Sequence, residues 1–333
     1  MSTRGVIAIF NEQSGWTLPE THVDRLKATA GDRLELSVAR SRPQLLDMLP
    51  DAECLIGFPL NENPLMLAPN LRWVQLTQSA GSAIRVLEQA MHSGLVVTSA
   101  EQFRAPQIAE HAIAMLLALT RRLNVAMSSQ ADHEWASETL ANRMGTLAGS
   151  SVGVIASGTV GGAIAQRLKA FGARVLATRR DANNPYMNVD EVFPPDQLDE
   201  MIMRVHALIV AVPLVGSTTH LLHKRRLSRM KRDAVLVDVS RGGVVDQTAL
   251  LDMLRKGRLS GAALDVFEHE PLPPTSPFYT MPSVIVTPHV AAASPHYWDQ
   301  ACAVISRNIT RFLDNQPMSD RLSEGWIKDA APA

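Results

Sequence analysis

Short apolar runs alternate with segments of helical periodicity along almost the whole chain. In the first hundred residues the runs predict strands at Val6–Phe10, Glu53–Phe58, Arg72–Leu76 and Leu95–Thr98. Between them lie segments such as His22–Ala30 and Ile84–Ser93, where apolar residues recur at helical spacing. Alternation of this kind predicts parallel βα units.

A second series of strands is predicted beyond a long helix at about Pro106 to Arg122, whose proline suits the first helical turn. The strands of this series are Ser151–Ala156, Arg174–Thr178, Ala207–Val212, Ala234–Val239, Gly261–Val266 and Val284–Thr287. Most are nearly continuous apolar runs, which is typical of parallel strands covered by helices on both faces. The more polar stretch 130–150 is expected to connect two domains, and the tail after Arg311 is expected to pack loosely.

Composition narrows the class of protein. A chain of 333 residues favours two domains, and 46% hydrophobic residues supply sizeable cores. The net charge of −1 leaves no basic footprint for nucleic acid, and no apolar run reaches the roughly 18 residues that span a membrane. Cys54 and Cys302 lie among apolar neighbours and are expected to be buried thiols of a cytoplasmic protein. No histidine has the spacing of a metal site.

The segment from Val152 to Gly172 carries the spacing of a dinucleotide site. A strand runs into Ala156-x-Gly158-x-x-Gly161 and then directly into an amphipathic helix. Glycines permit a tight turn and close approach of the backbone, and the helix N-terminus holds the pyrophosphate. Alanine stands in place of the usual first glycine. The strand, turn and helix together predict binding of a nicotinamide dinucleotide.

The end of the following strand bears on the choice between NAD and NADP. Thr178 is followed by Arg179 and Arg180, whereas an NAD site normally has an acidic residue there for the ribose hydroxyl. Arginine accommodates a 2′-phosphate. We therefore expect NADP to be favoured, with NAD still possible; the alternative is a solvated arginine pair.

Ionisable residues follow three further strands, where open α/β sheets bind ligands. The segments read V-L-V-D-V-S-R-G-G-V-V-D at 235–246, L-D-V-F-E-H-E-P-L-P at 264–273 and I-V-T-P-H-V-A-A-A at 285–293. Together with V-P-L-V-G-S-T-T-H-L-L at 212–222, they closely resemble the D-isomer-specific 2-hydroxyacid dehydrogenase family. The resemblance covers nearly the whole chain and is densest from about 108 to 294.

The resemblance implies three catalytic residues. Arg241 matches the arginine that orients the substrate carboxylate, for which its guanidinium fork is suited. His289 matches the acid–base histidine, and Glu270 matches its carboxylate partner, whose negative charge favours the protonated imidazole. Glu268 is interpreted as a solvated or supporting group, and His111 as a helix or interface residue.

The resemblance also implies binding residues. Asp265 matches the aspartate that contacts the nicotinamide carboxamide, with a strand-end cap as the alternative. The remaining expected dinucleotide contacts are Ser157, Gly158, Thr159, Val160, Arg179, Arg180, Val212, Pro213, Thr218, Val239, Ser240, Arg241 and His289. Ser79, Ala80 and Gly81 resemble the loop that receives the substrate carboxylate, alongside Arg241 and His289. Trp135 either reaches the site of a partner subunit or anchors an interface.

The sequence therefore predicts two α/β domains. Residues 104–292 form a Rossmann-type, doubly wound cofactor domain, and residues 1–103 with 293–333 form a flavodoxin-like substrate domain. The resemblance implies a homodimer that reduces a small 2-oxo acid, with glyoxylate and hydroxypyruvate as the leading class and bulkier acids open. The competing hypothesis is a dinucleotide-sensing binding module like the C-terminal-binding-protein corepressors, which share the fold.

Overall fold

The chain folds into two α/β units, which a computed structural model describes over residues 3–12, 15–57, 64–77, 87, 91–92, 94–100, 102–156, 158–179 and 188–322. Unit 1 comprises residues 1–103 and 294–333, and unit 2 comprises residues 104–293. The chain therefore passes between the units twice. The stretch 130–150, expected to connect two domains, lies inside unit 2, so that prediction was wrong.

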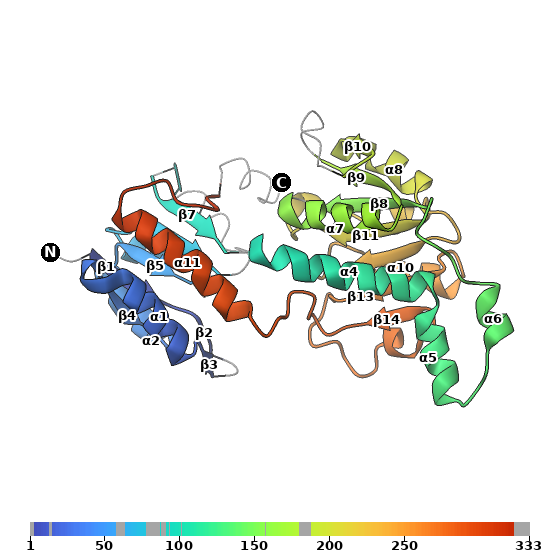
Figure 1. Ribbon diagram of the computed structural model, residues 1–333, viewed down its shortest axis with the longest axis horizontal. Helices are drawn as coiled ribbons and strands as arrows, with labels where there is room; N and C mark the ends of the chain where they lie inside the picture. Colours follow the sequence, from blue (N-terminus) through green and yellow to red (C-terminus); the bar gives the residue numbers. More distant parts are fainter. Residues whose placement is uncertain are drawn as a thin grey trace. The chain divides into compact units, whose positions relative to one another are not determined.

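Unit 1 is built on a parallel five-stranded sheet (Figure 1). Its strands, in spatial order, are β4 (Leu34–Val38), β1 (Thr3–Ile7), β5 (Cys54–Ile56), β6 (Trp73–Leu76) and β7 (Val96–Ser99). Its described α-helices are α1 (Glu20–Ala30), α2 (Arg42–Met48) and α11 (Tyr297–Leu313), and β2 (Phe10–Asn11) pairs with β3 (Trp16–Thr17). Apart from that hairpin, the order is the 2-1-3-4-5 order of flavodoxin-like folds, as predicted.

The C-terminal helix completes the core of unit 1. It lies beside α1 (Figure 1), and its Cys302, Ile305 and Ile309 are fully buried with Trp73 of the sheet. The segment after it is held as well, because Asn308 accepts hydrogen bonds from the backbone and side chain of Ser319. The expected loose packing after Arg311 was wrong as far as residue 322.

Unit 2 is built on a parallel seven-stranded sheet. Its strands, in spatial order, are β10 (Glu191–Phe193), β9 (Arg174–Thr178), β8 (Ser151–Ala156), β11 (Ala207–Ala211), β12 (Val235–Asp238), β13 (Gly261–Leu264) and β14 (Val284–Val286). Its α-helices are α4 (Ala105–Thr120), α5 (Leu123–Ala131), α6 (Ser137–Ala141), α7 (Gly158–Ala170), α8 (Leu198–Arg204), α9 (Lys224–Leu227) and α10 (Gln247–Arg255). This architecture confirms the predicted doubly wound fold.

Both faces of this sheet are buried, which explains the continuous apolar strands. Val237 packs with α4 and α7, which lie side by side on one face (Figure 1), whereas its neighbour Leu236 packs with α8 and α10. Successive residues of a strand point to opposite faces, so each must be apolar when helices cover both. The edge strands β4 and β10 were not predicted: β4 alternates apolar with exposed polar residues, and β10 has only three residues.

Candidate functional site

All strands of the seven-stranded sheet run parallel, so their carboxyl ends lie on the same side of the sheet and the segments that follow them begin there. The strand order reverses between β8 and β11, which are neighbours in the sheet although β9 and β10 separate them in sequence. Ligands of open α/β sheets bind at such a reversal, outside the carboxyl ends of the strands. The predicted site residues of unit 2 follow β8, β9, β11, β12, β13 and β14, except Trp135.

The turn after β8 leaves the backbone open at the start of a helix. Gly158 has a φ of 60°, and a Cβ built on it would meet no described atom within 4 Å. It begins the 13-residue helix α7, whose first turn has no acidic residue. The open backbone and the positive end of the helix fit a pyrophosphate. Thr159 is exposed and Val160 half-buried, while Ser157 lies outside the described residues.

Arg179 lies just beyond the end of β9. Its backbone N–H donates to the carbonyl of Phe193 at 2.9 Å, so the register of edge strand β10 holds its backbone. The side chain is half-buried, and no acidic residue precedes it at the strand end. Arg180 lies outside the described residues.

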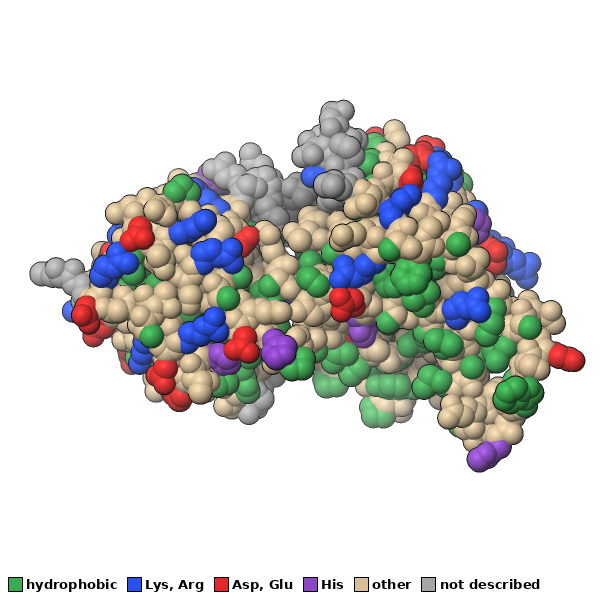
Figure 2. All heavy atoms as spheres, viewed as in Figure 1, with side chains coloured by type: hydrophobic (Ala, Val, Ile, Leu, Met, Phe, Trp, Pro, Cys, Tyr) green, Lys and Arg blue, Asp and Glu red, His purple; other side chains and the backbone are tan. Residues whose placement is uncertain are grey.

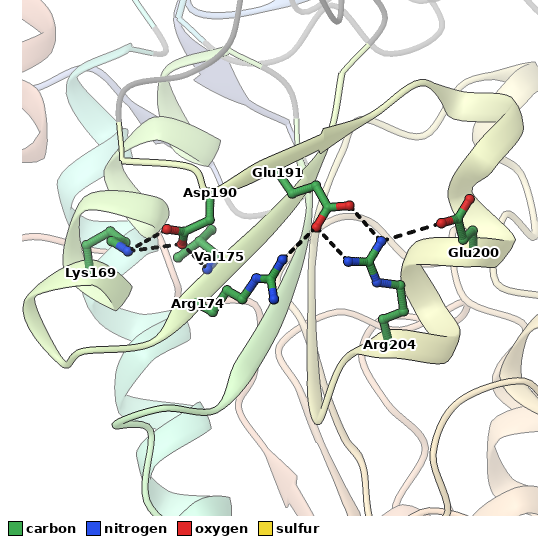
Figure 3. A network of polar contacts seen from close by, with 7 residues as sticks. All are labelled: Lys169, Arg174, Val175, Asp190, Glu191, Glu200 and Arg204. Carbon is green, nitrogen blue, oxygen red and sulfur yellow. Dashed lines mark hydrogen bonds and ion pairs between the residues drawn. The ribbon is translucent and has the colours of Figure 1, made fainter.

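A network of charges fastens β10 to β9 and to two helices (Figure 3). Glu191 accepts two hydrogen bonds from Arg204 at 2.6 Å and one from Arg174 at 3.0 Å. Asp190 accepts from Lys169 and from the backbone of Val175. The bonds from Arg204 are the main reason that the pKa of Glu191 lies below its ordinary value, and those from Lys169 act likewise on the pKa of Asp190.

The loop after β11 contains three expected cofactor contacts. Val212 and Pro213 are half-buried directly beyond the strand. The hydroxyl of Thr218 donates to the carbonyl of Pro213 at 2.6 Å and accepts from the backbone of Val215 at 2.8 Å. In the structure Thr218 therefore shapes the loop itself.

Beyond β12 the chain passes Val239 and Ser240, both buried, and reaches Arg241. The Nη1 of Arg241 donates to the carbonyl of Ser240 at 2.8 Å. At the next residue, a Cβ built on Gly242 would lie 1.8 Å from the carbonyl oxygen of Phe267. Only glycine permits this approach, which brings the Arg241 segment against the segment that follows β13.

The same contacts continue to Glu270 and His289. Glu270 Oε1 accepts from the backbone of Phe267 at 2.9 Å, and its Oε2 lies 2.7 Å from His289 Nδ1. The structure thus joins Arg241, Glu270 and His289 through Gly242 and Phe267. Glu268, the alternative two residues earlier, instead accepts from the backbone of Gln247 at 3.1 Å.

Asp265 is nearly completely buried and organises the turn that carries His289. Its carboxylate accepts from Thr287 Oγ1 at 2.6 Å and from the backbones of Val290 and Ala291 at 2.9 Å. Its carbonyl accepts from the backbone of His289 at 2.8 Å. These bonds match the strand-end cap that the sequence left as an alternative.

Sequence reasoning missed the position of His111. This helix α4 residue lies 3.0 Å from Thr287 Oγ1 and 3.5 Å from Asp265 Oδ1. It therefore supports the His289 turn from a helix more than 170 residues away in sequence. The histidine directly before the apolar stretch 112–119 of that helix was a signal in the sequence, but nothing there indicated its partner.

The remaining predicted residues lie elsewhere. Ser79, Ala80 and Gly81 fall outside the described residues. Trp135 lies between α5 and α6 with 92% of its surface exposed. In the part of the chain that the structure describes, no three His, Cys, Asp or Glu side chains could jointly hold a metal ion, and no helix is long and apolar enough to cross a membrane.

The sheet order and the glycine turn define a protein with a Rossmann-type dinucleotide-binding unit. The model of the family described as D-isomer specific 2-hydroxyacid dehydrogenase, NAD binding domain, matches residues 113–291. The chain belongs to this family. Its members are oxidoreductases, and the predicted family is thereby confirmed.

Similar proteins cover most of the chain. A glyoxylate reductase of Thermofilum pendens is 31% identical over 286 residues, which are 83% of either chain. A D-3-phosphoglycerate dehydrogenase of Mycobacterium bovis is 30% identical over 90% of this chain and 56% of its own length. The crystal structure of a family member from Aeromonas salmonicida has a TM-score of 0.77 and 28% identity, covering 97% of this chain and all of that one.

Proposed function

We propose that this protein reduces a small 2-oxo acid of the glyoxylate and hydroxypyruvate class to the D-2-hydroxy acid, with NADPH favoured as the hydride source. The contact of 2.7 Å between His289 Nδ1 and Glu270 Oε2 carries the proposal. A histidine paired with a carboxylate beside an arginine supplies both a proton and a carboxylate-binding group. The similarity to glyoxylate reductases supports the choice of substrate class.

His289 is the proposed acid. Because Nδ1 faces Glu270, the opposite ring nitrogen Nε2 is the atom that gives its proton to the substrate oxygen. Glu270 holds the ring and stabilises its protonated form. When bound, a nicotinamide dinucleotide would supply a hydride for the substrate carbon; His289 would give its proton to the oxygen, which makes the product an alcohol, and would become neutral.

Arg241 is the proposed anchor of the substrate carboxylate. A guanidinium can bind a carboxylate through two parallel hydrogen bonds, and the bond from Nη1 to the Ser240 carbonyl holds the guanidinium of Arg241 against its own loop. Ser79, Ala80 and Gly81 are proposed to receive the same carboxylate. A carboxylate bound to Arg241 through two hydrogen bonds has its 2-oxo carbon held in one orientation, which is what hydride transfer requires.

The proposed cofactor contacts are those expected from the sequence. The open backbone at Gly158 and the N-terminus of α7 fit the pyrophosphate, and Arg179 at the end of β9 fits a 2′-phosphate. Two further loops lie at the same edge of the sheet: the loop after β11 contains Val212, and the loop after β12 contains Val239 and Ser240. Asp265 follows β13 at this edge.

We further propose that the protein is a homodimer. Large hydrophobic side chains are exposed in the α5–α6 region of unit 2, namely Leu123, Met127, Trp135 and Met144. Figure 2 shows hydrophobic side chains gathered over the α4, α5 and α6 part of that unit. A second copy of the chain would remove this apolar surface from water.

A spectrophotometric assay tests the function. Purified protein is given NADPH or NADH with glyoxylate, hydroxypyruvate, pyruvate and phenylpyruvate, and oxidation of the nicotinamide is followed. We expect turnover with glyoxylate and hydroxypyruvate and a preference for NADPH. Cofactor binding without turnover of any of these acids would contradict the proposal and favour a dinucleotide-sensing role.

A further inference from the structure

Two buried aspartates lie beneath the proposed site. Asp238 ends β12 and Asp265 follows β13, and each has only 1% of its surface exposed. The backbone N–H of Asp265 donates to the carbonyl of Asp238 at 3.0 Å, so the two residues are neighbours across the sheet. The proposed roles of Arg241, Glu270 and His289 do not account for Asp238.

The hydrogen bonds of the two carboxyl groups differ. Asp265 has donors on both oxygens, from Thr287, Val290 and Ala291, as a carboxylate prefers. Asp238 Oδ1 accepts from the backbone of Ser240 at 3.0 Å and from the Ser240 hydroxyl. Its Oδ2 is buried and has no hydrogen-bond partner among the residues that the structure describes.

An unpartnered buried oxygen beside a second acid favours the uncharged carboxyl group. A carboxylate placed there would lose its hydration on Oδ2 and would be repelled by Asp265. Burial accordingly raises the pKa of Asp238 to about 7; the Ser240 hydrogen bonds oppose this shift and the charge of Asp265 adds to it.

The contacts of Asp238 lead directly to Arg241. Ser240, which donates twice to Asp238, also contacts the Arg241 carbonyl through its hydroxyl at 3.4 Å. The Ser240 carbonyl in turn accepts from Arg241 Nη1. Asp238 therefore holds Ser240, and Ser240 contacts Arg241 at its backbone carbonyl and at its guanidinium.

We propose that Asp238 is a positioning residue that, in its protonated and uncharged form, holds Ser240 so that Arg241 can receive the substrate carboxylate. This inference rests on the proposed function. When Asp238 loses its proton, the new charge repels Asp265 and moves the Asp238 carboxylate, which displaces Ser240 and, through the contacts of Ser240, Arg241. Misplacing a substrate-orienting group by a fraction of an ångström lowers the rate without abolishing it.

Among the described elements, few other charged groups face the Asp238 carboxyl group. Asp265 faces Asp238 from the end of β13. His111 approaches from α4, but through Asp265 and Thr287. The neighbouring strand β11, Ala207–Ala211, has no ionisable residue, and Arg241 comes from the same loop.

The experiment measures kcat/KM against pH in both reaction directions for the wild type and Asp238→Asn. Asparagine keeps the acceptor for Ser240 and cannot ionise. Loss of the His289 proton lowers reduction but raises oxidation of the hydroxy acid. Ionisation of Asp238 lowers kcat/KM in both directions. For the wild type, kcat/KM for oxidation should therefore fall about tenfold as the pH rises through the titration of Asp238. In Asp238→Asn this fall should disappear, with activity at about pH 6 near that of the wild type.

Asp246→Asn is the matched control, because Asp246 caps helix α10 by accepting from Ala249 and asparagine caps helices equally well. Its pH profile should follow the wild type. An unchanged fall in oxidation in Asp238→Asn would overturn the inference.

Infrared spectroscopy separates this inference from the proposed function. A carbonyl stretch of a protonated carboxylic acid that titrates near neutral pH in the wild type and is absent in Asp238→Asn supports the uncharged Asp238, even if no 2-oxo acid is turned over. If the asparagine variant fails to fold, the wild type alone decides. Absence of that band at about pH 6 would overturn the inference whatever the activity.

Discussion

His289 combines a rare backbone conformation with a close contact to a carboxylate. Its φ is 55°, a value that residues other than glycine seldom adopt. The backbone stays there because the His289 N–H donates to the Asp265 carbonyl and the carboxylate of Asp265 holds the next two residues. Strain that the surroundings enforce in this way occurs often at functional sites.

Glu270 and Glu268 give a matched pair of substitutions. Glu270→Gln should lower kcat by about a hundredfold, because the amide cannot stabilise the protonated imidazole. Glu268→Gln should stay within about threefold of the wild type, since Glu268 bonds to the Gln247 backbone instead. Steady-state kinetics, with cofactor affinity measured by fluorescence titration, check this. Equal losses in both variants would argue against the assignment.

Arg179 allows a test of cofactor preference at a single residue. Arg179→Asp should shift the ratio of kcat/KM for NADPH over NADH toward NADH by about a hundredfold, because a carboxylate repels the 2′-phosphate and accepts from a ribose hydroxyl. Arg307→Asp is a suitable control, since that arginine is exposed on helix α11 of unit 1 and takes no part in the network around β10. An unchanged ratio in Arg179→Asp would mean that the side chain does not contact the ribose.

At the scale of elements, the site depends on how closely the segments after neighbouring strands approach. Strand β12 pairs with β13, and β13 pairs with β14, so Arg241, Glu270 and His289 follow three adjacent strands. Gly242 sets the first of these spacings, because its missing side chain lets one segment contact the backbone of the next.

Gly242→Ala should therefore separate the Arg241 and Glu270 segments. Its Cβ would overlap the Phe267 carbonyl, and backbone rather than a flexible side chain must move. We expect kcat/KM to fall about a hundredfold or more. Gly162→Ala, on helix α7 with no described atom within 4 Å of the added Cβ, should keep its fold and serves as the control. Wild-type kinetics in Gly242→Ala would show that this approach is not required.

The edge strand β10 illustrates how a surface network supports an element. Glu191→Gln should lower the free energy of unfolding at neutral pH by about 1 kcal/mol or less, because exposed ion pairs contribute little. The bonds from Arg204 keep the pKa of Glu191 below the ordinary 4.5, so its contribution is present above that value and is lost as the pH falls through the lowered pKa.

Urea unfolding of both proteins at neutral pH and at about pH 3 measures this effect. The difference between them should shrink at the lower pH. A difference that grows on acidification would contradict the assigned direction of the pKa shift.

At the scale of the whole molecule, the exposed apolar surface of the α5–α6 region predicts the oligomeric state. The wild type should sediment as a dimer. Met127→Glu with Trp135→Glu should give a monomer, because two charges on each copy would be buried at the interface. Analytical ultracentrifugation measures this, and Met66→Glu, a change at an exposed methionine of unit 1, is the control. An unchanged dimer would place the interface elsewhere.

The sequence by itself predicted the positions of most strands along the chain, the glycine turn at Gly158 and the strand ends that carry Arg241 and His289. These depend on local periodicity and on short motifs that are contiguous in the chain. The choice of Glu270 over Glu268 came from resemblance to the family, and the structure places only Glu270 against His289. The untested roles of these residues stay predictions.

Only the tertiary structure decided which distant side chains meet. In the sequence Asp238 is only a single acidic residue at the end of an apolar strand, and the pairing of β12 with β13 is what places it beside Asp265. His111 reaches Thr287, and Asn308 holds Ser319 beyond the helix, through packing that no local pattern encodes. A periodicity specifies which face of an element is buried, whereas the partner of a buried polar group depends on the register and packing of the whole fold.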